Sequence, residues 1–86
     1  MRVNLSTHFR SYTAGKGTVH VPGSTVADVL AALDRDYPGL RFRIVDEQDH
    51  VRTHVKVFVN LRSIEDLSTP LAADDEVHVL GALSGG

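Results

Sequence analysis

The sequence has 86 residues, of which 42% are hydrophobic, so it accommodates one small domain and no second one. A domain of this size has a lean core and only shallow pockets, which argues against a self-sufficient enzyme. Nine Lys and Arg residues against eleven Asp and Glu residues give a net charge of −2, so nothing electrostatic favours binding to nucleic acid or to an anionic membrane.

The N-terminal part of the chain is predicted to form a β-hairpin. Apolar and polar residues alternate over residues 3–9 and again over residues 18–21, which is the pattern of half-buried strands. Residues 14–17, with the sequence AGKG, supply the backbone freedom that a tight reversal needs. The two strands are therefore expected to pair antiparallel.

One long helix is predicted to follow the hairpin. Its apolar stripe has helical spacing and consists of Val26, Val29, Leu30, Leu33 and Tyr37. Ser24 or Thr25 can cap its N-terminus, and Asp28 completes a variant of the capping box. The sequence Tyr-Pro-Gly at residues 37–39 ends it, because proline disfavours helical geometry in the residue before it.

The second half of the chain is predicted to be mainly β-structure. In chain order we expect a short strand at 40–45, an exposed polar turn at 46–50, the clearest strand at 54–60, a single helical turn at 64–67 and a last strand at 76–81. This order indicates an α+β fold of the β-grasp, or ubiquitin-like, type, with a mixed sheet of about four to five strands and one main helix on one face. The first and last strands should lie side by side in mid-sheet.

The chain continues past its last strand into a short tail. We expect a β-grasp domain at residues 1–81 and a flexible tail at residues 82–86, ending in Gly85 and Gly86. Two glycines without Cβ atoms are flexible and thin, so they can enter a narrow channel and present the terminal carboxylate to the active site of another protein. A carboxylate is a poor acyl donor, and adenylation would convert it to a good one.

The order of several short segments carries a family resemblance. The matching segments are residues 25–30 and 37–39 at the two ends of the helix, 57–60 in the late strand, 70–71 and 74–77 before the last strand, and the terminal pair 85–86. Taken together they resemble the ubiquitin-like sulfur carrier family, whose members include the small subunit of molybdopterin synthase and the sulfur carrier of the thiamine pathway. The resemblance covers nearly the whole chain.

The resemblance implies a protein substrate rather than an enzyme, although such a chain can also be a non-catalytic synthase subunit. A partner enzyme of the ubiquitin-activating type would use ATP and Mg²⁺ to adenylate Gly86, and a persulfide or sulfide donor would convert the adenylate to a thiocarboxylate. Sulfur would then pass to a biosynthetic acceptor enzyme. No side chain of this chain would be catalytic, and no cofactor would bind to it.

The tail departs from the commonest ending of the family, in which proline and valine often precede an alanine and the glycine pair. Residues 81–84 read Gly-Ala-Leu-Ser instead, so Ser84 would add a hydroxyl at the entrance of the partner's channel. Leu83 and Ser84 are candidate docking residues for the partner. Strand parity also places Phe58, Leu80 and His78, with His8 as a further candidate, on the sheet face opposite the helix. We expect these residues to form a docking patch for the partner, while simple shielding of the open sheet is the alternative.

Cysteine is absent, which excludes disulfide bonds, thiolate nucleophiles and cysteine-based zinc sites. Five histidines are present, at positions 8, 20, 50, 54 and 78, but without a convincing third ligand we expect surface imidazoles and no metal site.

The first residues alternate in polarity, and nowhere do about 18 apolar residues occur together. We therefore expect a cytoplasmic protein with neither signal peptide nor membrane span.

Three functions from different classes stay open. The chain can be a sulfur carrier, a ubiquitin-like modifier joined through Gly86 to lysines of other proteins, or a β-grasp binding module without tail chemistry. Intact mass after incubation with ATP, an adenylating enzyme and a sulfur source would separate them. The acceptor pathway also stays open, because molybdopterin, thiamine, cysteine, a thiolated tRNA base and secondary metabolites all need sulfur.

Overall fold

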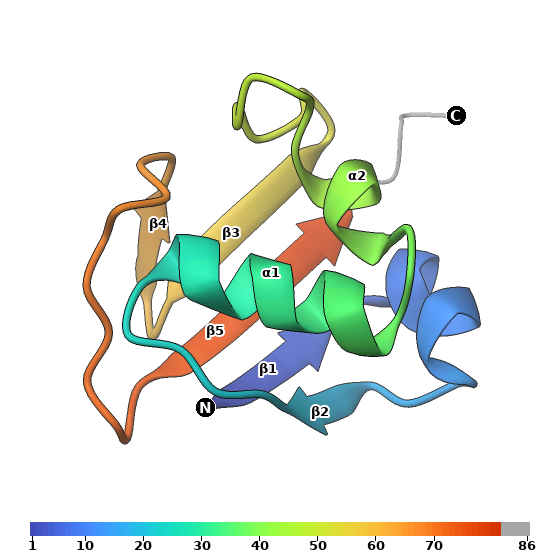
Figure 1. Cartoon of the computed structure of the whole chain (residues 1–86), viewed down its shortest axis with the longest axis horizontal. Helices are drawn as coiled ribbons and strands as arrows, with labels where there is room; N and C mark the ends of the chain where they lie inside the picture. The colour runs from blue at the N-terminus through green and yellow to red at the C-terminus, as the bar shows by residue number, and fades with distance from the viewer. Residues whose placement is uncertain (82–86) are drawn as a thin grey trace.

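The first and last strands lie side by side in the middle of one sheet in the computed structural model, which describes residues 1–81 (Figure 1). β1 (Arg2–Leu5) runs parallel to β5 (Glu76–Gly81), with Val3 beside Val77. The sheet has five strands in the order β2-β1-β5-β3-β4, and the remaining strands are β2 (Thr18–His20), β3 (Val55–Val59) and β4 (Arg62–Ile64). The mixed five-stranded sheet and its central pair are as predicted.

The main helix, α1 (Val26–Asp36), crosses one face of this sheet (Figure 1). The predicted stripe is fully buried at Val26, Val29, Leu30 and Leu33, where it packs into the same core as the inward valines of the strands. Burying one such side chain contributes roughly 1.5–3 kcal/mol. The predicted cap is confirmed, because Thr25 Oγ1 accepts the N–H of Asp28 at 3.2 Å. The Asp28 carboxylate accepts a hydrogen bond from the N–H of Ser24, one residue before the cap.

The segment after α1 is a short helix, α2 (Leu40–Ile44), so the predicted strand at 40–45 is wrong. Alternation of Leu40, Phe42 and Ile44 suggested a strand, but only Leu40 and Ile44 are buried, and residues four apart share one face of a helix. Gly39 begins the turn with a positive φ of 94°, and the Asp34 carboxylate accepts the N–H groups of both Gly39 and Arg41. These hydrogen bonds satisfy backbone donors at the start of α2.

The first strand is shorter than predicted, because the chain leaves the sheet after Leu5 and forms the 3-10 helix η1 (Thr7–Thr13). Phe9 still reaches the core, but from a helix rather than from the predicted strand at 3–9. Thr13 is fully buried, and its hydroxyl donates to the carbonyl of Lys16, which closes the reversal into β2. The antiparallel pairing of β1 with β2 is confirmed.

The predicted helical turn at 64–67 is also wrong, because Ile64 ends strand β4 instead. β4 pairs antiparallel with β3 and forms the edge of the sheet. Leu67 lies in the connector after β4, and its side chain is buried. This connector crosses the start of α1, where the carbonyls of Leu67 and Thr69 accept the N–H groups of Ala27 and Val26. The last strand, the turn at 46–50 and the strand predicted at 54–60 agree with the structure.

No helix in the described part of the chain is long and apolar enough to cross a membrane. The longest, α1, has 11 residues and packs on the sheet.

Asp75 is predicted to stabilise the entry into β5 in a pH-dependent manner. Its carboxylate accepts the N–H of Ala72 at 2.8 Å and the side-chain amide of Asn60 at 2.9 Å, and these hydrogen bonds lower the pKa of Asp75 below its usual value. The stabilisation is therefore present above the unfolded-state pKa of about 3.9 and is lost as the pH falls through the lower folded-state pKa. We expect Asp75→Asn to flatten the fall in unfolding free energy between about pH 5 and pH 2.

Urea unfolding at a series of pH values measures this effect. Asp74→Asn is the matched control, because the neighbouring Asp74 side chain makes no hydrogen bond within residues 1–81. Identical pH slopes for Asp75→Asn and the wild type would contradict the role of Asp75.

Candidate functional site

β5 ends at Gly81, and the residues predicted to carry the function follow it directly. Leu83, Ser84, Gly85 and Gly86 lie outside the described residues, as does the predicted tail at 82–86. The structure therefore describes the place from which the predicted tail starts, and the site is built around Gly81.

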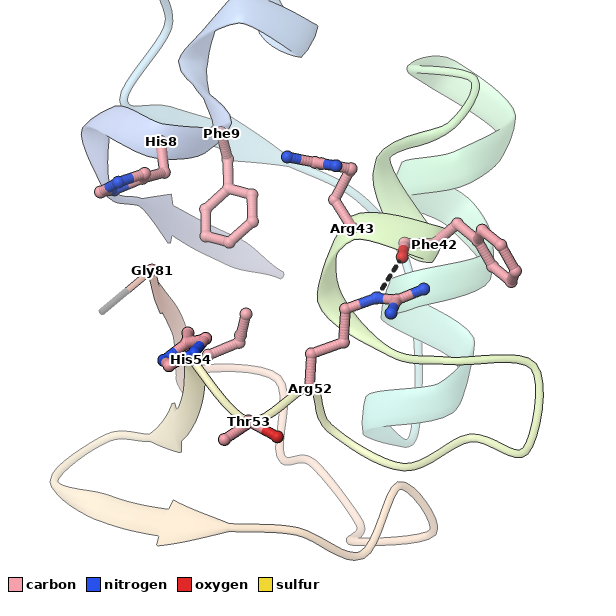
Figure 2. Close-up of a pocket in the computed structure, with 9 residues that line it drawn as sticks. His8, Phe9, Phe42, Arg43, Arg52, Thr53, His54 and Gly81 are labelled. Atoms are coloured by element: carbon pink, nitrogen blue, oxygen red, sulfur yellow. Dashed lines mark hydrogen bonds between the residues drawn. The ribbon is translucent and has the colours of Figure 1, made fainter. Parts of the chain in front are cut away.

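Gly81 is held by its neighbours on both sides. It pairs with Val55 of β3, and its N–H donates to the hydroxyl of Ser6 at 2.8 Å. A Cβ atom at Gly81 would lie 2.9 Å from Cβ and 3.0 Å from Cγ of His8, closer than Cβ atoms normally approach other atoms. Figure 2 shows His8 on the ribbon beside Gly81. The start of η1 therefore packs directly against the end of the last strand.

Two of the predicted docking residues face each other on the open side of the sheet. Phe58 of β3 lies directly opposite His78 of β5, and both side chains are half-buried. Leu80 is 42% exposed and lies opposite Lys56, one step closer to Gly81. The structure thus brings Phe58, His78 and Leu80 together on one face, as strand parity predicted. His8 belongs to η1 rather than to this face.

A polar network extends this open face onto β1. The Asn4 amide nitrogen lies 3.1 Å from Glu76 Oε1 and 3.3 Å from His78 Nδ1, and Thr18 Oγ1 donates to Asn4 Oδ1 at 2.9 Å. The open face consequently combines an apolar part on β3 and β5 with a polar part on β1 and β2.

Sequence reasoning missed a groove on the other side of Gly81. It lies between η1, α2 and the start of β3, has a volume of about 590 Å³, and includes Gly81 in its lining (Figure 2). Four lining residues carry basic side chains and two are aromatic: His8, Arg43, Arg52, His54, Phe9 and Phe42. No carboxylate belongs to this lining in the described part of the chain. The prediction of a strand at 40–45 concealed the groove, because it did not place Phe42 and Arg43 on a helix whose groove includes Gly81.

The histidines do not form a metal centre within residues 1–81. His8 and His54 line the groove, His50 pairs with Asp46 at 3.7 Å, and the others lie on strands. Among the described residues no three His, Cys, Asp or Glu side chains are close enough to hold a metal ion.

The packing of His8 on Gly81 leads to a prediction on stability. Gly81→Ala places a methyl group against His8, and overpacking of this kind costs roughly 1–3 kcal/mol of unfolding free energy. His8→Ala removes the ring, so we expect the double variant to recover part of this loss. Urea unfolding of the two single variants and the double variant gives the coupling energy. Strictly additive effects would show that the His8 ring does not cause the loss, because alanine keeps the Cβ atom of His8.

Comparison with known proteins identifies the family of this chain. The family model described as the ThiS family matches residues 3–86. The chain is 32% identical to a protein named sulfur carrier protein CysO from Mycobacterium tuberculosis, covering 98% of this chain and 96% of the relative. It is 35% identical to small archaeal modifier protein 3 from Haloferax volcanii, covering 73% of this chain and 71% of the relative. Both relatives are named as carrier or modifier proteins rather than as enzymes, as we expected for this chain.

Solved structures agree with the sequence relatives. The crystal structure of M. tuberculosis CysO has a TM-score of 0.89 at 28% identity, with 95% of this chain and 98% of that chain covered. A crystal structure of the BexX/CysO complex from Amycolatopsis orientalis has a TM-score of 0.90 at 25% identity, with 99% of this chain and 98% of that chain covered. With its ubiquitin-like β-grasp fold and a family match over nearly its whole length, the chain belongs to the ThiS family.

Proposed function

We propose that this chain is a sulfur carrier and that Gly86 holds the sulfur as a thiocarboxylate. The main support is the family match, which runs to residue 86 and so includes Gly85 and Gly86. A relative named as a sulfur carrier aligns with 98% of the chain, which adds to that support. The exit of the last strand at Gly81, at one end of the sheet, is compatible with a tail that enters another protein.

The proposed chemistry takes place on a partner enzyme. The Gly86 carboxylate attacks the α-phosphate of ATP, which releases pyrophosphate and leaves an acyl-adenylate. Sulfide then attacks the carbonyl carbon and AMP leaves, so that one oxygen of the carboxylate is replaced by sulfur. With a persulfide donor the product is an acyl disulfide, and a thiol reductant releases the thiocarboxylate. ATP and Mg²⁺ belong to the partner, and this chain contributes only its terminus.

A complex with a partner protein has precedent among the structural relatives. The A. orientalis protein was solved as a complex of CysO with BexX. For this chain we propose three partners: an adenylating enzyme of the ubiquitin-activating type, a persulfide sulfur donor and a sulfur-accepting biosynthetic enzyme. The exposed side chains around Gly81 provide a surface on which these partners can dock, and in this proposal none of those side chains is catalytic.

Protein modification is the second candidate function. The similarity to small archaeal modifier protein 3 favours it, because the same activated Gly86 would form an isopeptide bond with a lysine amine instead of a bond to sulfur. The two functions share the adenylation step and differ only in the nucleophile.

Mass spectrometry of the intact chain tests both functions. The full chain is incubated with ATP, Mg²⁺, an adenylating enzyme from the same organism and sulfide. We expect the exchange of one oxygen for sulfur, and deletion of Gly86 should abolish it. Isopeptide-linked products would support the modifier instead. An unchanged mass with every adenylating enzyme of the organism would overturn both and leave a binding module.

The docking patch on the open face has its own test. Leu80→Ala and Phe58→Ala should each lower kcat/KM for adenylation by roughly three- to tenfold, because apolar side chains of this kind anchor interfaces. Leu61→Ala is the matched control, since Leu61 is 97% exposed but lies in the β3–β4 turn, at the end of the sheet away from Gly81. Thermal unfolding confirms that each variant folds. If the Leu80 and Leu61 variants react equally fast, Leu80 does not contact the enzyme.

A further inference from the structure

We propose that the groove beside Gly81 is a second docking surface, and that an acidic segment of the adenylating enzyme occupies it. The inference rests on the proposed function, because it concerns the enzyme that receives the tail. The groove lies on the helix side of the sheet, whereas Phe58, His78 and Leu80 lie on the open side. Contacts on both sides of Gly81 would hold the root of the tail in a defined orientation.

The charge of the groove is opposite to that of the whole molecule. The chain has a net charge of −2, yet Arg43 and Arg52 lie together in a lining without carboxylates. Arg41, on the same helix as Arg43, forms an ion pair with Asp49. Neither Arg43 nor Arg52 has such a carboxylate partner within residues 1–81. The Asp46 carboxylate lies within electrostatic range of Arg52, but neither arginine forms an ion pair within residues 1–81, so both cations are available to an anionic group on another molecule.

Arg52 is held in place for such a contact. Its Nε donates to the carbonyl oxygen of Phe42 at 2.6 Å, and its guanidinium carbon lies 5.2 Å from the centre of the Phe42 ring (Figure 2). The two terminal nitrogens of the guanidinium stay available, and they match the two oxygens of a carboxylate. Because part of the side chain is already ordered, binding costs less conformational entropy.

The aromatic residues favour a protein partner over a simple anion. Phe42 is 49% exposed on α2, and its ring lies beside the Arg52 guanidinium, whereas the Arg43 side chain points the other way, towards Phe9 (Figure 2). Arginine and aromatic residues are the types that contribute most to protein interfaces. An acidic segment with an apolar residue would satisfy both the arginines and Phe42.

The groove lies where an enzyme that binds Gly86 has to contact this chain. Gly86 is five residues after Gly81, and a fully extended chain of that length spans at most about 18 Å. An active site that reaches Gly86 must therefore bring its rim close to Gly81, which itself lines the groove. Charge complementarity at such a rim speeds association and orients the complex.

Charge reversal in the full-length chain tests this inference. We expect Arg43→Glu combined with Arg52→Glu to lower kcat/KM for ATP–pyrophosphate exchange by roughly tenfold or more at low salt, through a higher KM for the carrier and an unchanged kcat. Raising NaCl from about 0.02 M to about 0.3 M should lower the wild-type value towards that of the variant, because salt screens the attraction. Arg43→Gln with Arg52→Gln should give a smaller loss in the same direction, and it replaces the charge reversal if that variant fails to fold.

The matched control is Arg35→Glu combined with Arg62→Glu. It changes the net charge by the same amount, but these residues lie on α1 and β4 and do not line the groove. Equal kcat/KM values for the control and the groove variant would overturn the inference while the proposed function stands. A lower kcat with an unchanged KM would also overturn it. If the wild type is not adenylated at all, the proposed function fails and the inference fails with it.

Discussion

Parallel pairing between β1 and β5 is the constraint on which the rest of the structure depends. It joins segments from the two ends of the chain, and the Gly81 N–H bonds to a hydroxyl 75 positions earlier in the sequence, at Ser6. β5 pairs with β3 as far as Gly81 and with β1 as far as Val79, and beyond that point the Ser6 hydroxyl takes the place of a strand partner. The last strand therefore holds Gly81, the residue after which the terminal segment begins, in a defined position.

The two faces of the sheet next to Gly81 are chemically different. The open face presents Phe58, His78 and Leu80 from adjacent strands, and the helix side presents a basic groove between η1 and α2. Burial of the α1 stripe keeps the inner face of the sheet inaccessible, whereas these two surfaces are open to a partner. Under the proposed function, these two surfaces would orient the chain on an enzyme that binds its terminus.

Much of this architecture was predictable from local patterns. The stripe of α1, the alternating valines of β3 and β5 and the cap at Thr25 are periodic or short-range signals, and the structure confirms them. Strand parity sufficed to put Phe58, His78 and Leu80 on one face, because side chains alternate strictly along a strand. The errors fell on short segments. Leu40, Phe42 and Ile44 fit both a strand and a helix, and five residues are too few to distinguish the two periods.

The sequence by itself determined the fold class, the order of the long elements, the family and the residues of the open-face patch. Each of these follows from the spacing of side chains along one segment or from the order of segments. Only the tertiary structure decided what surrounds Gly81. The turn of η1 brings Ser6 and His8 against it, and the helical form of α2 places Arg43 and Phe42 in the lining of one groove with Arg52. Those contacts join residues far apart in the chain, and they depend on how α2 and η1 pack over the end of the sheet, which no local pattern specifies.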